Sequence, residues 1–76
     1  NMTPYLFVDA TRPNTMVPEQ FIKDGQIILN IVPHAVHALH MSNDAITFSG
    51  RFGGVSRDIY VPRAAVLGIY ARENGQ

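Results

Sequence analysis

Three histidines spaced three residues apart are the side chains whose pattern most readily suggests chemistry: His34, His37 and His40. On a helix this spacing would align them on one face, and imidazole is the commonest metal ligand in proteins. On a strand, the odd separation of His37 and His40 would point the two rings to opposite faces. A catalytic zinc site also needs an open coordination position and groups that orient its ligands. We therefore expect surface or turn histidines and no metal, and keep a small metal-dependent enzyme as a third alternative.

The nucleophiles and acids of the chain are scattered. None of its serines at 42, 49 and 56 has the G-x-S-x-G context of a serine hydrolase. The carboxylates stand singly along the chain, at Asp9, Glu19, Asp24, Asp44, Asp58 and Glu73. Only folding could bring two of them together as an acid–base pair. The sequence therefore predicts that the protein is not an enzyme.

The arginines could serve a nucleic-acid surface, because bases stack on aromatic rings beside cations. Arg51, Arg57, Arg63 and Arg72 form no contiguous basic run, although Phe52 and Tyr60 lie near them in the sequence. Six basic residues balance six acidic ones, so no overall field attracts phosphate. We favour core aromatics with solvated arginines, and keep an Sm-like RNA-binding module as the alternative.

Composition predicts one small globular domain over residues 1–76, with 46% hydrophobic and 16% charged residues. The absence of cysteine excludes disulfides and thiolate metal sites, and fits a reducing compartment. No apolar run approaches the ~20 residues of a membrane span, so we expect no membrane partner. Because Asn1 precedes Met2, we expect a domain cut from a longer chain.

The pattern of the chain is typical of an all-β domain. The segment 26–32 is almost continuously apolar, which predicts a strand covered on both faces. Gly68 and the apolar residues around it favour a strand over a helix near the end of the chain. The predicted elements are a strand at 5–10, a loop at 12–24 with a possible helical turn at 17–21, a strand at 26–32, a hairpin at 37–42 and 45–52, a strand at 55–61 ended by Pro62, a short 3₁₀ turn at 62–65 and a strand at 66–72. Such spacing predicts a small open barrel or a two-sheet sandwich.

Gly50 is the most suggestive residue of the predicted hairpin. The alternation of the strand places Ile46, Phe48, Gly50 and Phe52 on one face, and expects a bulky residue at position 50. A glycine there permits close approach of another backbone, or marks a bulge or a bend. The functional reading is a shallow notch that a bound peptide fills.

Three segments of the chain, in this order, resemble one protein family. They are Asp24 to Asn30 (DGQIILN), Ser49 to Arg57 (SGRFGGVSR) and Val66 to Gly75 (VLGIYARENG). Together they resemble the stringent starvation protein B (SspB) family, and the likeness runs from Thr3 to Gly75. The resemblance implies a small open barrel of SH3-like or Sm-like topology. It also implies a cytoplasmic bacterial adaptor, without cofactor or metal, that binds the ssrA degradation tag of incompletely synthesised proteins and delivers them to the ClpXP protease.

The resemblance also implies a site and partners. Proteins of this family bind the tag as an extended segment in a groove, through backbone hydrogen bonds and apolar pockets. They dimerise through an N-terminal helix and reach the ClpX unfoldase through an acidic tail, and we expect both segments to be missing from these 76 residues. The peptide-binding candidates on this chain are Met2, Ala35, Val36, Gly50, Arg51 and Phe52.

Overall fold

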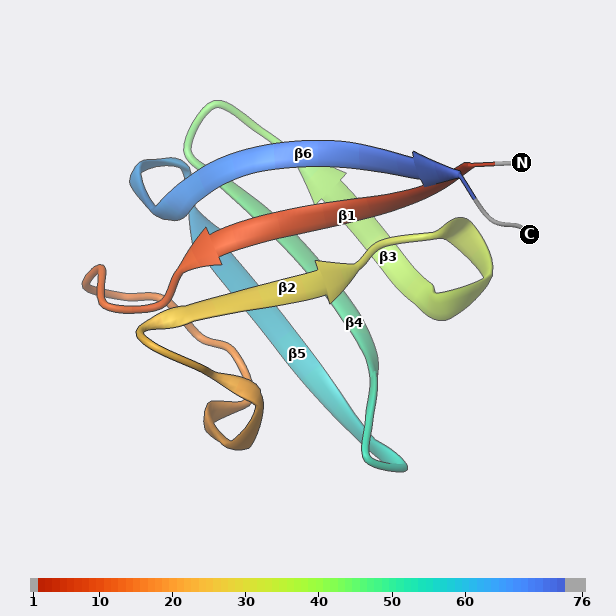
Figure 1. Ribbon diagram of the computed structural model, residues 1–76, viewed down its shortest axis with the longest axis horizontal. Coiled ribbons are helices and arrows are strands. Elements are labelled where there is room, and N and C mark those ends of the chain that lie inside the picture. The colour runs from red at the N-terminus through yellow and green to blue at the C-terminus, as the bar shows by residue number, and fades with distance from the viewer. Residues whose placement is uncertain (1, 74–76) are drawn as a thin grey trace.

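The protein folds into two small antiparallel sheets, seen in a computed structural model that describes residues 2–73 (Figure 1). The strands are β1 (Met2–Asp9), β2 (Gln26–Asn30), β3 (Val36–Met41), β4 (Ala45–Phe52), β5 (Val55–Pro62) and β6 (Val66–Glu73), and the 3₁₀ helices are η1 (Glu19–Phe21), η2 (Pro33–Ala35) and η3 (Arg63–Ala65). One sheet has the order β2-β1-β6 and the other the order β3-β4-β5. The all-β prediction is confirmed in its two-sheet form, and the sheets do not close into a barrel.

The core lies between the two sheets and takes side chains from both. Leu6 and Val8 of β1 face Ile46 of β4 and Val61 of β5, and all four are fully buried. Alternation along each strand turns every second residue to this interior. The predicted strand at 26–32 is shorter than expected, and its two faces differ. Ile27 and Leu29 are buried, whereas Ile28 is 57% exposed, so the prediction that both faces are covered is wrong.

The two hairpins of the second sheet follow the predicted pattern. Gly53 and Gly54 connect β4 to β5 with φ angles of +61° and +82°, the left-handed values that favour glycine. This two-residue turn places Phe52 opposite Val55 and fixes the register of all eight pairs of the ladder. The turn at residues 43–44 joins β3 to β4, as the sequence predicts.

A bulge in β3 changes which side chains share a face. His37 pairs with Ser49 and His40 pairs with Thr47, so three steps on β3 match two steps on β4. Ala38 lies within the bulge with φ of +56°. Because Ser49 and Thr47 point the same way, His37 and His40 share the outer face of the sheet. The expectation that their odd separation would separate them is therefore wrong: the bulge adds one residue.

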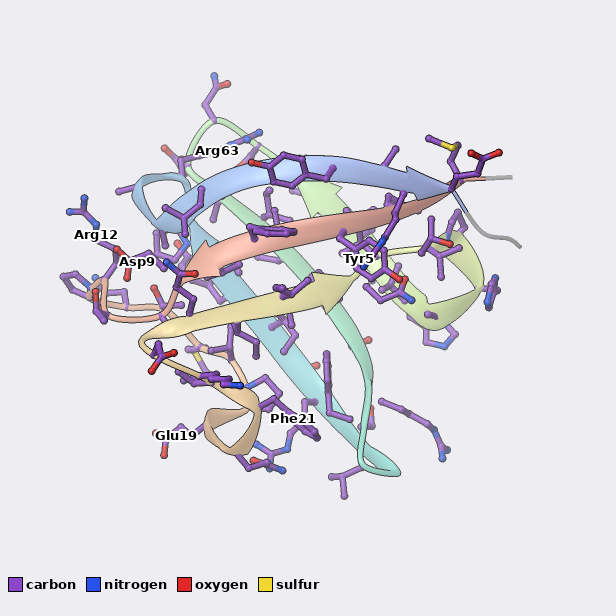
Figure 2. The ribbon with its side chains drawn as sticks, viewed as in Figure 1. Tyr5, Asp9, Arg12, Glu19, Phe21 and Arg63 are labelled. Carbon is purple, nitrogen blue, oxygen red and sulfur yellow. The ribbon has the colours of Figure 1, made fainter. Side chains whose placement is uncertain are left out.

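The segment between β1 and β2 begins with a tight turn (Figure 2). The backbone N–H and the hydroxyl of Thr11 both donate hydrogen bonds to the Asp9 carboxylate, and Arg12 Nε lies 3.7 Å from that carboxylate. These groups lower the pKa of Asp9, with the Thr11 hydroxyl as the largest cause. Further along, the predicted helical turn is present as η1, directly after Pro18.

The predicted loop at 12–24 also contains a contact that its sequence did not indicate. Met16 forms an isolated antiparallel bridge with Tyr60 of β5. Met16 therefore covers part of the outer edge of β5, and the residue remains 60% exposed. Near the same end of β5, Arg63 in η3 donates from Nε to the Ser42 carbonyl at 2.7 Å and ties η3 to the β3–β4 turn.

Candidate functional site

An open hollow of about 400 Å³ gathers residues from four elements, and we call it the Arg51 hollow. It is lined by His34 and Ala35 of η2, His37 of β3, Gly50 and Arg51 of β4, and Ser56 of β5. Apolar wall atoms therefore lie beside one permanent cation, two imidazoles and a hydroxyl. Among residues 2–73, no carboxylate side chain lines this hollow.

The sequence around Pro33 builds one wall of the Arg51 hollow. Pro33 occupies the first turn of η2, where a missing N–H is tolerated. The Asn30 carboxamide oxygen accepts a hydrogen bond from Val32 N–H at 3.0 Å, and the Ala35 N–H donates to the Val32 carbonyl at 2.9 Å. These bonds turn the chain sharply between the two sheets, and the turn brings Ala35 against Gly50.

Gly50 is buried, and atoms of the protein itself occupy the space that a side chain at this position would need. A Cβ atom at Gly50 would lie 3.3 Å from the Ala35 carbonyl oxygen and 3.6 Å from the ring of Phe52. The ring of Phe48 is the next neighbour, at 3.9 Å. Thus η2 already occupies the space above Gly50. A long side chain there would strain the fold before it blocked a ligand.

The six peptide-binding candidates lie in three different environments. Ala35, Gly50 and Arg51 line the Arg51 hollow. Val36 is buried in the core opposite Gly50, and Phe52 packs against the core and against Phe21, with ring centroids 6.2 Å apart. These two support the hollow from below. Met2 is 56% exposed at the start of β1, in the other sheet, and does not line the hollow.

His34, His37 and Ser56 line the hollow and were not among the candidates. A signal for Ser56 was present, because the two-residue turn at Gly53-Gly54 places Ser56 opposite Arg51. The position of His37 follows from the register between β3 and β4, where His37 pairs with Ser49. His34 lies in η2 beside Ala35, so the break at Pro33 pointed to it.

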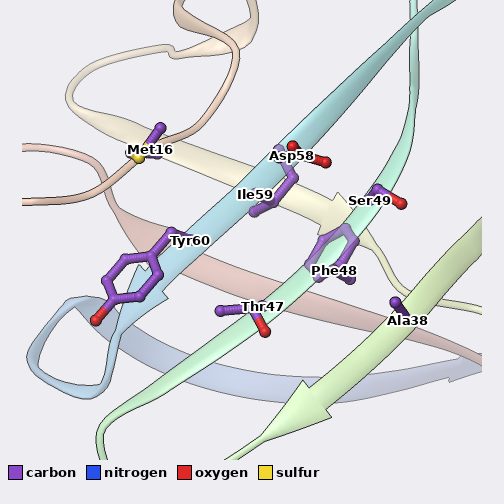
Figure 3. A pocket seen from close by; sticks show the side chains of 8 residues that line it. All are labelled: Met16, Ala38, Thr47, Phe48, Ser49, Asp58, Ile59 and Tyr60. Carbon is purple, nitrogen blue, oxygen red and sulfur yellow. The ribbon is translucent and has the colours of Figure 1, made fainter.

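A second hollow, of about 330 Å³, continues along the outer face of the same sheet (Figure 3). We call it the Met16 hollow. Met16 and Tyr60 lie at one side of it and Ala38 at the other, with Thr47 and Ser49 between them. Phe48, Asp58 and Ile59 complete the lining. The two hollows are neighbours on the sheet, since His37, which lines the first, pairs with Ser49, which lines the second.

The three histidines do not all lie at the Arg51 hollow. Over residues 2–73, no three His, Cys, Asp or Glu side chains gather where they could hold a metal ion. His34 and His37 share the Arg51 hollow, whereas His40 does not line it. In the same part of the chain, no helix is long and apolar enough to cross a membrane.

Two comparisons with known proteins point to the same family. The family model described as stringent starvation protein B matches residues 1–76. A curated relative, the stringent starvation protein B homolog of Haemophilus influenzae, is 53% identical over 75 residues. The match covers 99% of this chain and 50% of that protein, so the chain spans about half the length of the relative.

Proposed function

Because the chain belongs to the stringent starvation protein B family, we propose that it is a peptide-binding adaptor domain rather than an enzyme. Its ligand is the ssrA degradation tag of incompletely synthesised proteins, and its task is to bring tagged proteins to the ClpXP protease. The tag binds in extended form on the outer face of the sheet β3-β4-β5, beginning at the Arg51 hollow.

One observation carries this proposal. Ala35, Gly50 and Arg51, three of the peptide-binding candidates that the family resemblance implies, line a single open hollow although they come from two different elements. The hollow has the mixed character that peptide sites need, with apolar contact surface beside a few polar groups that fix orientation.

The chemistry of the lining suits an extended segment. Arg51 is exposed and has five guanidinium donors for peptide carbonyls or carboxylates. The His37 and Ser56 side chains add polar groups from the strands on either side of β4. Specificity then comes from side chains that alternate into the wall, and affinity from bonds to the peptide backbone.

The proposed domain would deliver tagged proteins by tethering them to the unfoldase. An adaptor that holds the tag at one site and the unfoldase at another raises the effective concentration of substrate without new contacts at the protease. In the proposed arrangement the 76 residues supply the tag site, and a family tail outside them supplies the unfoldase contact.

The RNA-binding alternative has less support. Arg51 lines the Arg51 hollow, Arg57 lies beside Val17 and Pro18, and Arg72 lies on the outer face of the other sheet. Phosphate contacts dominate nucleic-acid affinity and need a basic stripe. These dispersed arginines do not form one.

A direct test is fluorescence anisotropy with a labelled ssrA-tag peptide. The parent should bind the tag, and Arg51→Ala should weaken binding at least tenfold, about 1.4 kcal/mol. Arg57→Ala is the matched control, because it removes the same charge from the next strand outside the Arg51 hollow, and it should bind like the parent. Tag affinity no greater than that for a scrambled peptide, or tighter binding of a short RNA, would overturn the proposal.

A degradation assay tests the adaptor role separately. Added to ClpXP, a tagged substrate and a full-length member of the family, residues 1–76 should slow degradation by occupying the tag. The Arg51→Ala variant should slow it less. Acceleration by the 76 residues alone would place the unfoldase contact inside them. It would contradict the proposal that a segment outside them makes this contact.

A further inference from the structure

We infer that the Arg51 hollow is a pH-dependent site, which binds carboxylate-bearing peptide more tightly when His34 and His37 carry protons. This inference rests on the proposed function, and it adds to that function a means of regulation and one chemical class of ligand. It is carried by three side chains of one hollow, the two imidazoles and the Arg51 guanidinium.

The register of the sheet sets His37 beside Arg51. His37 pairs with Ser49, and Arg51 lies two residues further along β4 on the same outer face. Diagonal neighbours of this kind are about 7–8 Å apart. His34 lines the same hollow from η2, so two imidazoles from different elements share the hollow with one permanent cation.

The two imidazoles have no counter-charge beside them in the folded protein. Within residues 2–73, neither His34 nor His37 makes a hydrogen bond or an ion pair, and no carboxylate side chain lines their hollow. Asp58 is the acidic residue on this face of the sheet, and it lies opposite Ser49 on β5. It is therefore two strand spacings from His37, about 10 Å, which is the screening length at about 0.1 M salt.

The remaining titratable and charged groups of these strands lie outside the hollow. His40 and Tyr60 are on the same face, and both pair with Thr47. Arg57 is opposite Gly50 and lines a different hollow, beside the segment 15–19. A ligand carboxylate at the Arg51 hollow would therefore meet the two imidazoles and one guanidinium.

Protonation changes the charge of the hollow in one direction. Imidazole changes its charge between about pH 5 and pH 8. With both imidazoles neutral, the lining carries the Arg51 charge alone; with both protonated, two further positive charges join it. Each added charge at about 7 Å strengthens the attraction for a carboxylate about two- to threefold in water. Peptide carboxylates titrate near pH 4 and keep their own charge, so acidification in this range tightens binding.

Fluorescence anisotropy at about pH 8 and about pH 5.5 tests the inference. The probe is the ssrA-tag peptide labelled at its N-terminus, so that no free α-amine titrates. The parent should bind it at least threefold more tightly at the lower pH, and a smaller change would overturn the inference. The double variant His34→Gln/His37→Gln should change by twofold or less. A larger change would assign the titration to other groups and would also overturn it.

His40→Gln is the matched control, because His40 is an exposed histidine of the same face outside the hollow. It should keep the full pH dependence of the parent, and loss of that dependence would contradict the assignment to the hollow. A fixed charge gives the converse result: His37→Arg should tighten binding at pH 8, and unchanged affinity there would also contradict the inference. All three histidines are exposed, so these variants should fold, which circular dichroism at both pH values checks.

A second peptide tests the ligand side of the interaction. In this peptide each carboxylate of the tag is replaced by a carboxamide, which keeps the shape and removes the charge. The parent should bind it with a difference of twofold or less between the two pH values. A larger difference would show that protonation acts without a ligand carboxylate, and the inference would be wrong.

Proton uptake is a readout that does not depend on affinity. If protonation favours binding, binding must favour protonation by the same factor, because the two equilibria are linked. Titration calorimetry at about pH 6.5, in two buffers of different ionisation enthalpy, should show net proton uptake when the parent binds the tag. The variant His34→Gln/His37→Gln should take up none. Absence of uptake by the parent would overturn the inference.

Failure of this inference differs from failure of the proposed function. If the parent binds the tag with the same affinity at both pH values, the pH dependence is wrong while the adaptor function stands. If the parent binds the tag at neither pH, the proposed function falls, and the pH dependence falls with it.

Discussion

The backbones of Met16 and Tyr60 bond to each other in both directions, Met16 N–H to the Tyr60 carbonyl at 2.8 Å and Tyr60 N–H to the Met16 carbonyl at 3.0 Å. This bridge attaches the 10–25 segment to the edge of β5. Met16→Pro removes one donor and should cost about 1 kcal/mol of stability. Met16→Ala keeps both bonds and should melt close to the parent. Equal melting temperatures for the two variants would show that the bridge contributes nothing.

The bulge in β3 holds Ala38 at φ of +56°, a conformation that disfavours a side chain. Ala38→Gly should therefore stabilise the protein by up to about 1 kcal/mol, through relief of that strain. The control is Ala71→Gly on β6, where the backbone is extended and glycine should destabilise by about 0.5–1 kcal/mol. Chemical denaturation of both variants measures the contrast. Destabilisation by Ala38→Gly would contradict the assigned bulge.

Two strand glycines should respond in opposite ways to a methyl group. At Gly50 a Cβ meets the Ala35 carbonyl oxygen at 3.3 Å, and this backbone atom can yield only if η2 moves. Gly50→Ala should therefore destabilise by about 1 kcal/mol or more. At Gly68 the nearest atoms belong to the exposed ring of Tyr70, which can turn away. Gly68→Ala should be neutral or stabilise by about 0.5 kcal/mol. Reversal of this order in thermal melts would refute the packing of η2 on β4.

Two isoleucines that look alike in the sequence differ in how deeply the fold buries them. Ile46 is fully buried, whereas Ile28 is 57% exposed on the outer face of β2. Ile46→Ala should cost about 2–5 kcal/mol because it leaves a cavity in the core. Ile28→Ala should cost well under half as much. If urea unfolding gave similar losses, the outer face of β2 would be covered after all.

The pH dependence of Asp9 has a defined sign. Hydrogen bonds from Thr11 are the main cause that lowers the pKa of Asp9 in the folded protein, and Arg12 adds a smaller effect. Because the folded-state pKa lies below the unfolded-state pKa, ionised Asp9 contributes stability above the unfolded-state pKa. This contribution is lost as pH falls through the folded-state pKa. Thr11→Ala should raise the pKa of Asp9 more than Arg12→Ala does, in an NMR titration of the carboxyl carbon. The opposite order would contradict the turn geometry.

The sequence predicted the strands where glycines and prolines mark their ends. Gly53 and Gly54 specify a two-residue turn, and that turn fixes the pairing of β4 with β5. Pro33 and Pro62 each mark a passage from one sheet to the other, and a 3₁₀ helix follows at both. The strand β2 was predicted, but the prediction that both of its faces are covered was wrong, because a run of apolar residues does not reveal whether the second face will be covered. Ile28 points outward on β2 and is 57% exposed.

Part of the candidate site could also be predicted, because local features of the sequence mark it. Ala35, Gly50 and Arg51 are neighbours of a proline break and a glycine, which are visible locally. Val36 and Phe52 lie beside them in the sequence but pack toward the core. The β3 bulge and the Met16–Tyr60 bridge depend on contacts between distant segments. No spacing rule therefore pointed to the Met16 hollow.

The place of β1 between β2 and β6 has a consequence for synthesis on the ribosome. β1 is made first, yet one of its two neighbours is made last among the strands. A nascent chain that stops before Val66 can form the β4–β5 hairpin early, but it leaves one edge of β1 without a partner. Because such long-range pairing is slow and exposes aggregation-prone edges, the domain should reach its native form only after β6 has left the exit tunnel. A protein proposed to act on interrupted translation products would itself be unfinished if translation stopped within its last strand.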